Sequence, residues 1–232
     1  MVWLKMSLIG NYIKDIKYNE IPVDARLQTQ NDIDISRIQM KAKIKFTIYD
    51  SDGKIVKQWE EPSKSLTFYY AVFEYNLWSQ GNYTMIDTSG SSITPNMGSP
   101  GIASINAGSG IATYGIVVGS GNTANVSVKS TIISLIAPIP NGSGSGQLLY
   151  QNVSFTNPTV SQNTSSFTLS RNFINLSGNL VSISEVGIIA YVSGFGIANP
   201  DYFLFAYDIP SSAISLANGQ TLNITYTFTV VA

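Results

Sequence analysis

The chain has 232 residues, a formal net charge of −1, and neither Cys nor His. Disulfides are therefore excluded, as are a His general base and a His metal ligand, and no global field favours nucleic acid. No apolar run is long enough to span a bilayer, and the stretch 1–11 is too short and too interrupted for a signal peptide, so we expect the chain to fold in a cytoplasm.

The few charges are unevenly distributed. Charged residues make up 12% of the chain, against about 25% in an ordinary soluble domain. Because a lone soluble monomer usually keeps charge on its surface, we interpret the deficit as surface that identical neighbours cover; glycosylation or simple compositional bias is the alternative. Residues 88–232 contain only five charged side chains, namely Lys129, Arg171, Glu185, Asp201 and Asp208.

Residues 1–37 are expected to form an arm containing a short amphipathic helix. Its apolar residues recur at intervals of three and four, as on one face of a helix, whereas residues 19–31 show no clear period. The arm is expected to dock on a neighbouring copy or on its own sheet. The recurring apolar residues are Trp3, Leu4, Leu8, Ile9, Tyr12, Ile13 and Ile16.

Residues 40–61 are predicted to form a β-hairpin. Apolar residues alternate with Lys43, Lys45 and Thr47, and Asp50-Ser-Asp-Gly53 supplies turn residues. The stripe formed by Lys41, Lys43 and Lys45 is interpreted as a solvated strand face rather than a nucleic-acid site. The turn lacks the distal bidentate Glu of a calcium loop.

Residues 63–80 are predicted to form a helix, with Ser63 or Ser65 as its cap and Gly81 after its end. Large apolar and aromatic residues surround it almost completely, so we expect a helix buried on most sides that closes one end or face of a sheet. Core packing is favoured over an aromatic ligand site.

The rest of the chain is predicted to be strands and turns. Residues 83–87 form a strand and 88–110 a loop with repeated Gly and Pro. Short alternating runs separated by Gly- and Asn-rich turns follow between residues 114 and 192, and further strands occupy 202–207 and 222–231. Roughly eight to ten strands at this spacing predict a mainly β fold: a single, jelly-roll-like β-sandwich domain over 38–232 that includes the helix.

The chain from Lys41 to Ala232 resembles a family of structural virion proteins of tailed phages and archaeal viruses. The order of the motifs along the chain carries the resemblance. The motifs are Asp-Ser-Asp-Gly-Lys-Ile-Val (50–56), Ser-Lys-Ser-Leu-Thr-Phe (63–68), Asp-Thr-Ser-Gly (87–90), Gly-Ile-Val-Val-Gly-Ser-Gly (115–121), Gly-Gln-Leu-Leu-Tyr (146–150), Ser-Arg-Asn-Phe-Ile-Asn-Leu-Ser-Gly (170–178), Glu-Val-Gly-Ile (185–188) and Asn-Gly-Gln-Thr-Leu-Asn-Ile-Thr-Tyr-Thr-Phe (218–228).

The resemblance implies a β-rich component of a tail, adaptor or capsid vertex, located in the virion, without catalysis and without a cofactor. Two features of the family are missing here. The acidic residue that it often has near Ser130 and the basic residue near Ala206 are absent, so any charge contact between those segments is in doubt.

Residue types also argue against an enzyme. Nucleophilic catalysis by Ser lacks its His base, and the glycine-rich run 142–146 lacks the Lys that follows a phosphate-binding loop. No catalytic, cofactor or metal residue is assigned. Glu185 and Arg171, each among the few charges available to the other, are predicted to form a buried ion pair rather than a catalytic site.

Two functions remain open. The first is a homo-oligomeric virion subunit in a ring or vertex that also contacts other virion proteins. The second is a carbohydrate-binding module for host attachment, in which Tyr202, Phe203 and Tyr207 stack on a surface glycan. Neither involves a specific nucleic acid or a transmembrane segment. Acceptor signals for glycosylation occur at Asn82, Asn125, Asn141, Asn152, Asn163, Asn175 and Asn223.

Overall fold

A computed structural model describes residues 39–63, 66–121 and 132–231 of the chain. These residues form mainly strands and one helix, which confirms the expectation of a mainly β protein. The predicted N-terminal arm, residues 1–37, lies outside the described residues.

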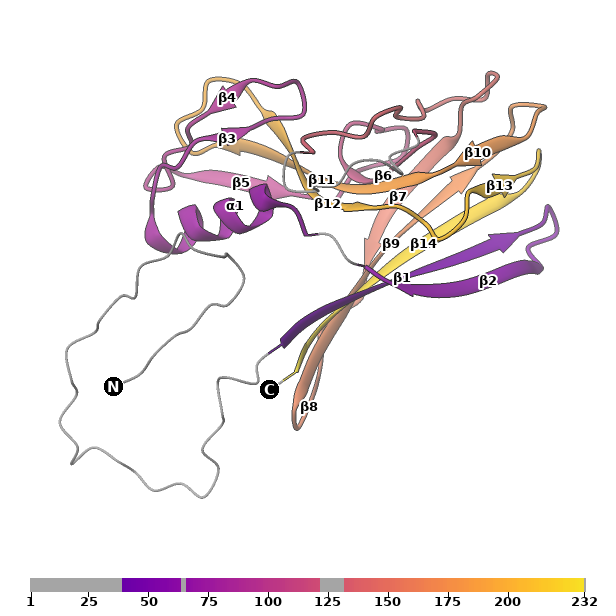
Figure 1. Ribbon diagram of the computed structural model, residues 1–232, viewed down its shortest axis with the longest axis horizontal. Helices are drawn as coiled ribbons and strands as arrows, with labels where there is room; N and C mark the ends of the chain where they lie inside the picture. The colour runs from indigo at the N-terminus through magenta and orange to yellow at the C-terminus, as the bar shows by residue number, and fades with distance from the viewer. Residues whose placement is uncertain (1–38, 64–65, 122–131, 232) are drawn as a thin grey trace.

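The largest sheet has six strands, all antiparallel to their neighbours, in the order β2-β1-β14-β9-β7, with β8 beside β9 (Figure 1). It brings the first described strands next to the last one, which lies at its centre. The strands are β1 (Gln39–Tyr49), β2 (Ile55–Pro62), β7 (Leu149–Phe155), β8 (Thr159–Ser161), β9 (Thr164–Ile174) and β14 (Thr221–Val231).

Strand β14 shows why the sequence folds in this way. Leu222, Ile224 and Tyr226 are fully buried, while the Asn and Thr residues between them are partly exposed. This is the alternation predicted from the sequence, because successive side chains of a strand point to opposite faces. The whole strand pairs with β1 on one side and β9 on the other.

A second sheet of four strands has the order β12-β11-β5, with β6 also paired to β11. Two small two-stranded sheets, β10–β13 and β3–β4, complete the fold. The strands are β3 (Met85–Ile86), β4 (Ser92–Ile93), β5 (Gly101–Ser104), β6 (Gly115–Gly119), β10 (Val181–Ile183), β11 (Glu185–Gly194), β12 (Asp201–Asp208) and β13 (Ile214–Leu216).

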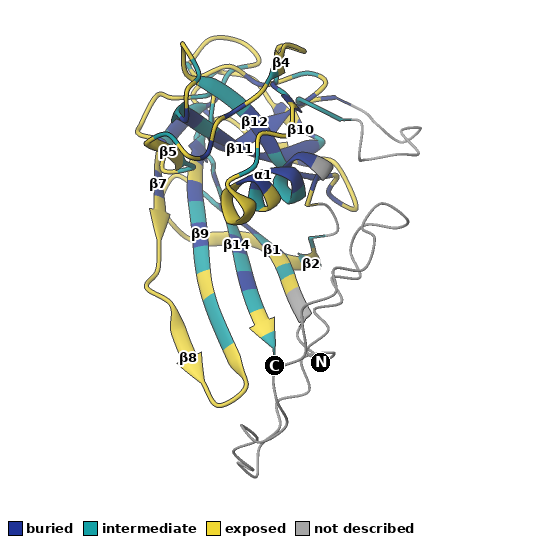
Figure 2. Ribbon diagram, turned by 90° about the vertical axis from the view of Figure 1, so that its left-hand side faces the viewer, coloured by how far each residue is buried: buried dark blue, intermediate teal, exposed yellow. Residues whose placement is uncertain are grey.

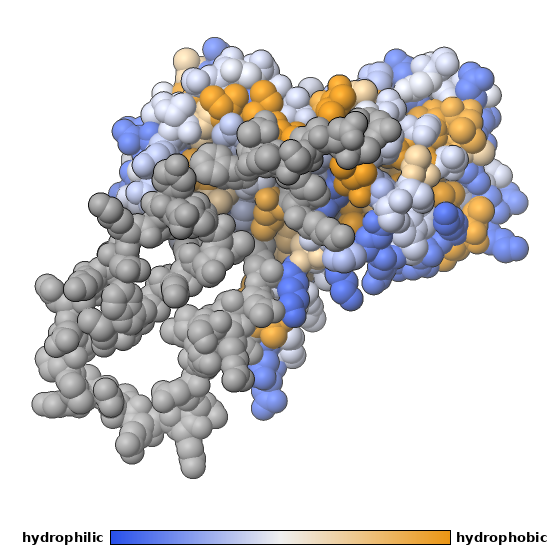
Figure 3. Space-filling model, in the orientation of Figure 1, coloured by the Kyte–Doolittle hydropathy of each residue, from blue (hydrophilic) through white to orange (hydrophobic). Residues whose placement is uncertain are grey.

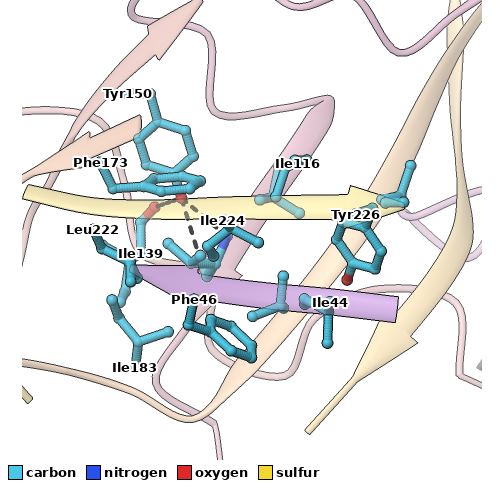
Figure 4. Packing of buried hydrophobic residues seen from close by; sticks show 14 of the residues in the cluster. Ile44, Phe46, Ile116, Ile139, Tyr150, Phe173, Ile183, Leu222, Ile224 and Tyr226 are labelled. Atoms are coloured by element: carbon cyan, nitrogen blue, oxygen red, sulfur yellow. Dashed lines mark hydrogen bonds between the residues drawn. The ribbon is translucent and has the colours of Figure 1, made fainter. Parts of the chain in front are cut away.

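One hydrophobic core joins the two large sheets. It combines side chains of β1, β9 and β14 with others from β6, β11 and β12. Figure 4 shows Phe46, Ile116 and Phe173 packed around Ile224. Burying each such side chain contributes roughly 1.5–3 kcal/mol, so this cluster is the main source of stability.

The predicted hairpin is confirmed. β1 and β2 pair from Tyr49 back to Lys43, and Asp50 closes the turn by accepting hydrogen bonds from the backbone N–H groups of Asp52 (3.0 Å) and Lys54 (2.9 Å). Gly53 adopts a positive φ of 79°, which glycine tolerates without strain.

The helix differs from its prediction. α1 (Phe68–Ser79) begins after Thr67, whose side chain accepts a hydrogen bond from the Tyr70 N–H, and is capped at its C-terminal end by Gln80. Only one face is buried: Val72 and Phe73 pack in a second core cluster against β11 and β12, whereas the Trp78 side chain is 66% exposed. The expectation of a helix buried on most sides is therefore corrected.

The segment predicted as a loop, 88–110, contains two short strands. β4 pairs with β3, and β5 pairs with the end of β11. Neither strand contains a run of alternating apolar and polar residues long enough to be predicted from the sequence. Gly101 in β5 lies so close to the Phe195 ring and backbone that a Cβ atom would collide with both.

Candidate functional site

The buried guanidinium of Arg171, in β9, is bound by the backbone. All five of its hydrogen bonds go to carbonyl oxygens, which brings the segment 108–116 and strand β7 onto β9. The acceptors are the carbonyls of Gln151 (2.7 Å to Nε), Tyr114 (3.1 Å) and Ile116 (2.9 Å) at Nη1, and Gly108 (3.1 Å) and Ile111 at Nη2.

Aromatic rings cover the same guanidinium. Its central carbon lies 4.8 Å from the Tyr150 ring centroid and 6.0 Å from that of Phe173, within the range of cation–π attraction. Burial lowers the pKa of Arg171 to about 10, which leaves it charged at neutral pH. Burial also raises the pKa of Tyr150 to about 12. Arg171 thus holds a loop, two strands and an aromatic pair together.

Glu185, at the start of β11, is the second fully buried charge. Its carboxylate accepts hydrogen bonds from three backbone N–H groups, those of Gly121 (3.1 Å), Ile136 (3.0 Å) and Ala137 (2.8 Å), and from the Tyr207 hydroxyl (2.9 Å). Such charge-assisted bonds are roughly twice as strong as neutral ones. They attach the segments at 121 and 136–137 to the second sheet.

The predicted ion pair between Glu185 and Arg171 is corrected by these contacts. The carboxylate binds N–H and O–H donors, and the guanidinium binds carbonyls. Opposite charges are scarce in this chain, but peptide groups carry both donors and acceptors. They can therefore satisfy a buried charge of either sign.

Two glycines make room for the Glu185 carboxylate. A Cβ atom on Gly119 would collide with that carboxylate and with the Ala137 carbonyl, and one on Gly121 would lie 2.6 Å from Glu185 Oε1. The Gly-Ser-Gly run 119–121 is therefore required by a close approach of backbone to side chain. The two glycines are visible in the sequence, but the sequence does not show that the Glu185 carboxylate is the group that approaches them.

The aromatic residues expected to stack on sugar do not form an exposed platform. Phe203 and Tyr207 are buried in the two core clusters. Only Tyr202 is partly exposed, and its ring packs against those of Tyr114 (centroids 6.2 Å apart) and Tyr191 (5.9 Å). Phe203 and Tyr207 are therefore withdrawn as glycan contacts.

The glycosylation signals differ in accessibility. Asn82 and Asn163 are exposed. Asn175 is fully buried, and its Nδ2 donates to the carbonyls of Asn179 (2.8 Å) and Leu216 (2.7 Å). The prediction that Asn175 can be glycosylated is therefore corrected. Asn141, Asn152 and Asn223 engage their amides in hydrogen bonds within the fold, and Asn125 lies outside the described residues.

The outer face of β7, β9 and β14 is polar without being charged. Register places Ser, Thr and Asn side chains in continuous rows there. They bond to one another: the Asn223 amide donates to Asn172 Oδ1 (2.7 Å), and Thr225 donates to Asn223 Oδ1 (2.8 Å). We call this surface the polar face; its residues are Ser154, Ser166, Thr168, Ser170, Asn172, Asn223, Thr225, Thr227 and Thr229.

The predicted lysine stripe borders this surface. Along β1, Lys41, Lys43 and Lys45 pair in register with Thr229, Thr227 and Thr225 of β14. Lys41 and Lys43 are exposed, and Lys45 is half-buried. The stripe is thus a solvated edge of the polar face. Over the face of the molecule drawn in Figure 3, hydrophobic residues lie among hydrophilic ones.

Across residues 39–63, 66–121 and 132–231, no three metal-ligating side chains gather at one place. Among these same residues, helices with the length and apolarity needed to cross a membrane are absent. Comparisons with protein-family models, with characterised proteins and with solved structures found no match.

Proposed function

We propose that the chain is a structural virion subunit of an archaeal virus or phage. In this proposal residues 38–232 form one β-sandwich, jelly-roll-like domain, and identical copies assemble in a symmetric vertex, tail or adaptor ring. The family resemblance motivates the viral assignment, and the polar face motivates the assembly.

The observation that carries the proposal is the polar face. It spans β7, β9 and β14 with Ser, Thr and Asn side chains and no charged residue among them. Separating such a surface from water costs less than burying charges, which carry a large desolvation penalty. Hydrogen-bonding rows can pair with an equivalent surface on another copy, and closed symmetric assemblies are the common outcome for identical subunits.

The surroundings of Glu185 support a structural role. A general acid or base must reach substrate within hydrogen-bond distance, yet both Glu185 oxygens are occupied by donors of the chain itself. We therefore assign this carboxylate to folding and assign no catalysis to the chain.

The experiment that separates this proposal from the carbohydrate-binding alternative examines the purified full chain in two ways. Electron microscopy at concentrations near those of an assembling particle is expected to show closed symmetric oligomers, with no retention of the protein on polysaccharide columns. A monomer that such columns retain would contradict the proposal and support the alternative.

A further inference from the structure

The six-stranded sheet extends beyond the part that the second sheet covers. In Figures 1 and 2, the ends of β9 and β14 and the short strand β8 project away from the other elements, and β1 begins there too. The main core cluster ends, on this side, at Phe228. Past Phe228, none of the described helices and strands packs over this face of the sheet.

Register shows which side chains occupy that face. Val230 pairs with Ser165, and Ser165 pairs with Val160, so these three share a face with Phe228 and Phe167 two residues back. Phe155 joins them through its pairing with the buried Leu169. Val160 is 79% exposed, Phe155 45%, Val230 42% and Phe167 36%. We call these four residues the extension face.

The extension face continues the core. The Phe167 ring stacks on Phe228 with centroids 5.2 Å apart, and Phe228 in turn stacks on the buried Tyr226 at 6.1 Å. Four large apolar side chains side by side on one face are unusual for a surface without a partner. The nearby lysines Lys41 and Lys43 lie on the opposite face of the sheet, because they pair with Thr229 and Thr227.

We propose that the extension face binds the apolar side chains of residues 3–16 of the same polypeptide. These residues supply Trp3, Leu8 and Ile13 among other large apolar groups. The extension face offers a charge-free surface on which such groups can be buried, at roughly 25 cal/mol per Å² of apolar area removed from water.

Residues 17–38, which join residues 3–16 to β1, are long enough to let that segment reach the extension face. The chain enters β1 at Gln39, which pairs with Val231 at the projecting end of the sheet. Residues 17–38 span at most about 70 Å when extended, whereas the eleven-residue strands of this sheet are about 37 Å long. Residues 3–16 can therefore fold back onto the extension face. A tether of this length also gives an effective concentration on the order of millimolar, which favours the chain's own segment over a neighbour's.

The test uses the full chain, which has no Cys of its own, with a single cysteine at either of two adjacent exposed positions. Val160→Cys lies on the extension face, and Ser161→Cys, its matched control, lies on the opposite face because Ser161 pairs with Thr164. Each variant is made with and without the paired substitutions Ile9→Asp and Ile13→Asp. The rate of reaction with a maleimide is measured over a dilution series.

We expect Val160→Cys to react at least about tenfold more slowly than Ser161→Cys, equivalent to about 1.4 kcal/mol of docking free energy. The Asp substitutions should restore its rate and leave that of Ser161→Cys unchanged. Equal rates in the two single variants, or protection that the Asp substitutions do not remove, would overturn the proposal. Protection lost on dilution would overturn it too, because a second copy would then cover the face. A monomeric chain with concentration-independent protection would refute the assembly proposal but support this one.

Discussion

At the scale of single residues, Arg171 takes all of its hydrogen-bond partners from the backbone, and Glu185 takes all but the Tyr207 hydroxyl. Each holds segments that lie far apart in the sequence: Arg171 joins β7, β9 and the segment 108–116, and Glu185 joins β11 to residues 121 and 136–137. Few charges follow Asp87 in this chain. These two side chains therefore link distant segments through hydrogen bonds to the backbone, as ion pairs do in more highly charged proteins. Their role is to fix loops onto the sheets.

Arg171→Ala should therefore destabilise the fold by about 3–5 kcal/mol, because buried polar groups that lose their partner cost about 1–3 kcal/mol and the emptied space adds a cavity cost. The substitution leaves five carbonyls without their donor and empties space beside Tyr150 and Phe173. Urea unfolding measures the change. The exposed basic residue Lys43 provides the control, because Lys43→Ala should change stability by no more than about 0.5 kcal/mol. Equal effects of the two substitutions would refute the role given to Arg171.

Tyr226 predicts a loss of stability in alkali. Burial, with the nearby Asp208 carboxylate, raises its pKa well above the ordinary 10.0, and its hydroxyl donates to Asp208 Oδ2 (3.0 Å). The folded state then holds this proton more tightly than the unfolded state. The contribution is present below pH 10 and declines above it, by about 1.4 kcal/mol per pH unit.

Unfolding free energies of the wild-type chain and Tyr226→Phe, measured from neutral pH to above pH 10, test this expectation. The variant should lose less stability with rising pH, while Tyr83→Phe at an exposed position should behave as the wild type. A Tyr226→Phe slope equal to that of the wild type would show that this hydroxyl does not control the alkaline response.

At the scale of elements, the two faces of α1 differ sharply. Phe73 lies between Phe195 and Phe205, with ring centroids 6.5 and 5.2 Å away, whereas Trp78 is mostly exposed. Phe73→Ala should cost about 3–5 kcal/mol, as for emptied aromatic core sites. Trp78→Ala, in the same helix, should leave the thermal midpoint nearly unchanged. Similar midpoints for both variants would contradict the one-sided packing of α1.

The elements show what the sequence could predict. Strands β1, β2 and β14 were predictable because alternation with period two and a turn at Asp50–Gly53 are local signals. The exposed face of α1 was not, since its apolar residues surround the helix and only tertiary packing decides which of them are buried. Similarly, Glu185 was predicted to be buried, but its backbone donors come from residues 48 to 64 positions earlier in the chain.

At the scale of the whole molecule, the two faces of the six-stranded sheet have different chemistry. One face packs on the core and continues as the extension face. The other carries the polar face, which is bordered by Lys41, Lys43 and Lys45. Because no charged group lies within the polar face, contacts made there should be little affected by ionic strength, which screens interactions between exposed charges over about 10 Å at 0.1 M salt.

Sedimentation of the full chain at low and high salt tests the assembly claim most directly, using the wild type and the double variant Thr168→Lys, Thr227→Lys on the polar face. We expect an oligomer of the same size at both salt concentrations, and a smaller species for the variant, whose like charges would repel and lose hydration on contact. A wild-type chain that remains monomeric at both salt concentrations, with protein near the concentration of an assembling particle, would refute assembly through the polar face.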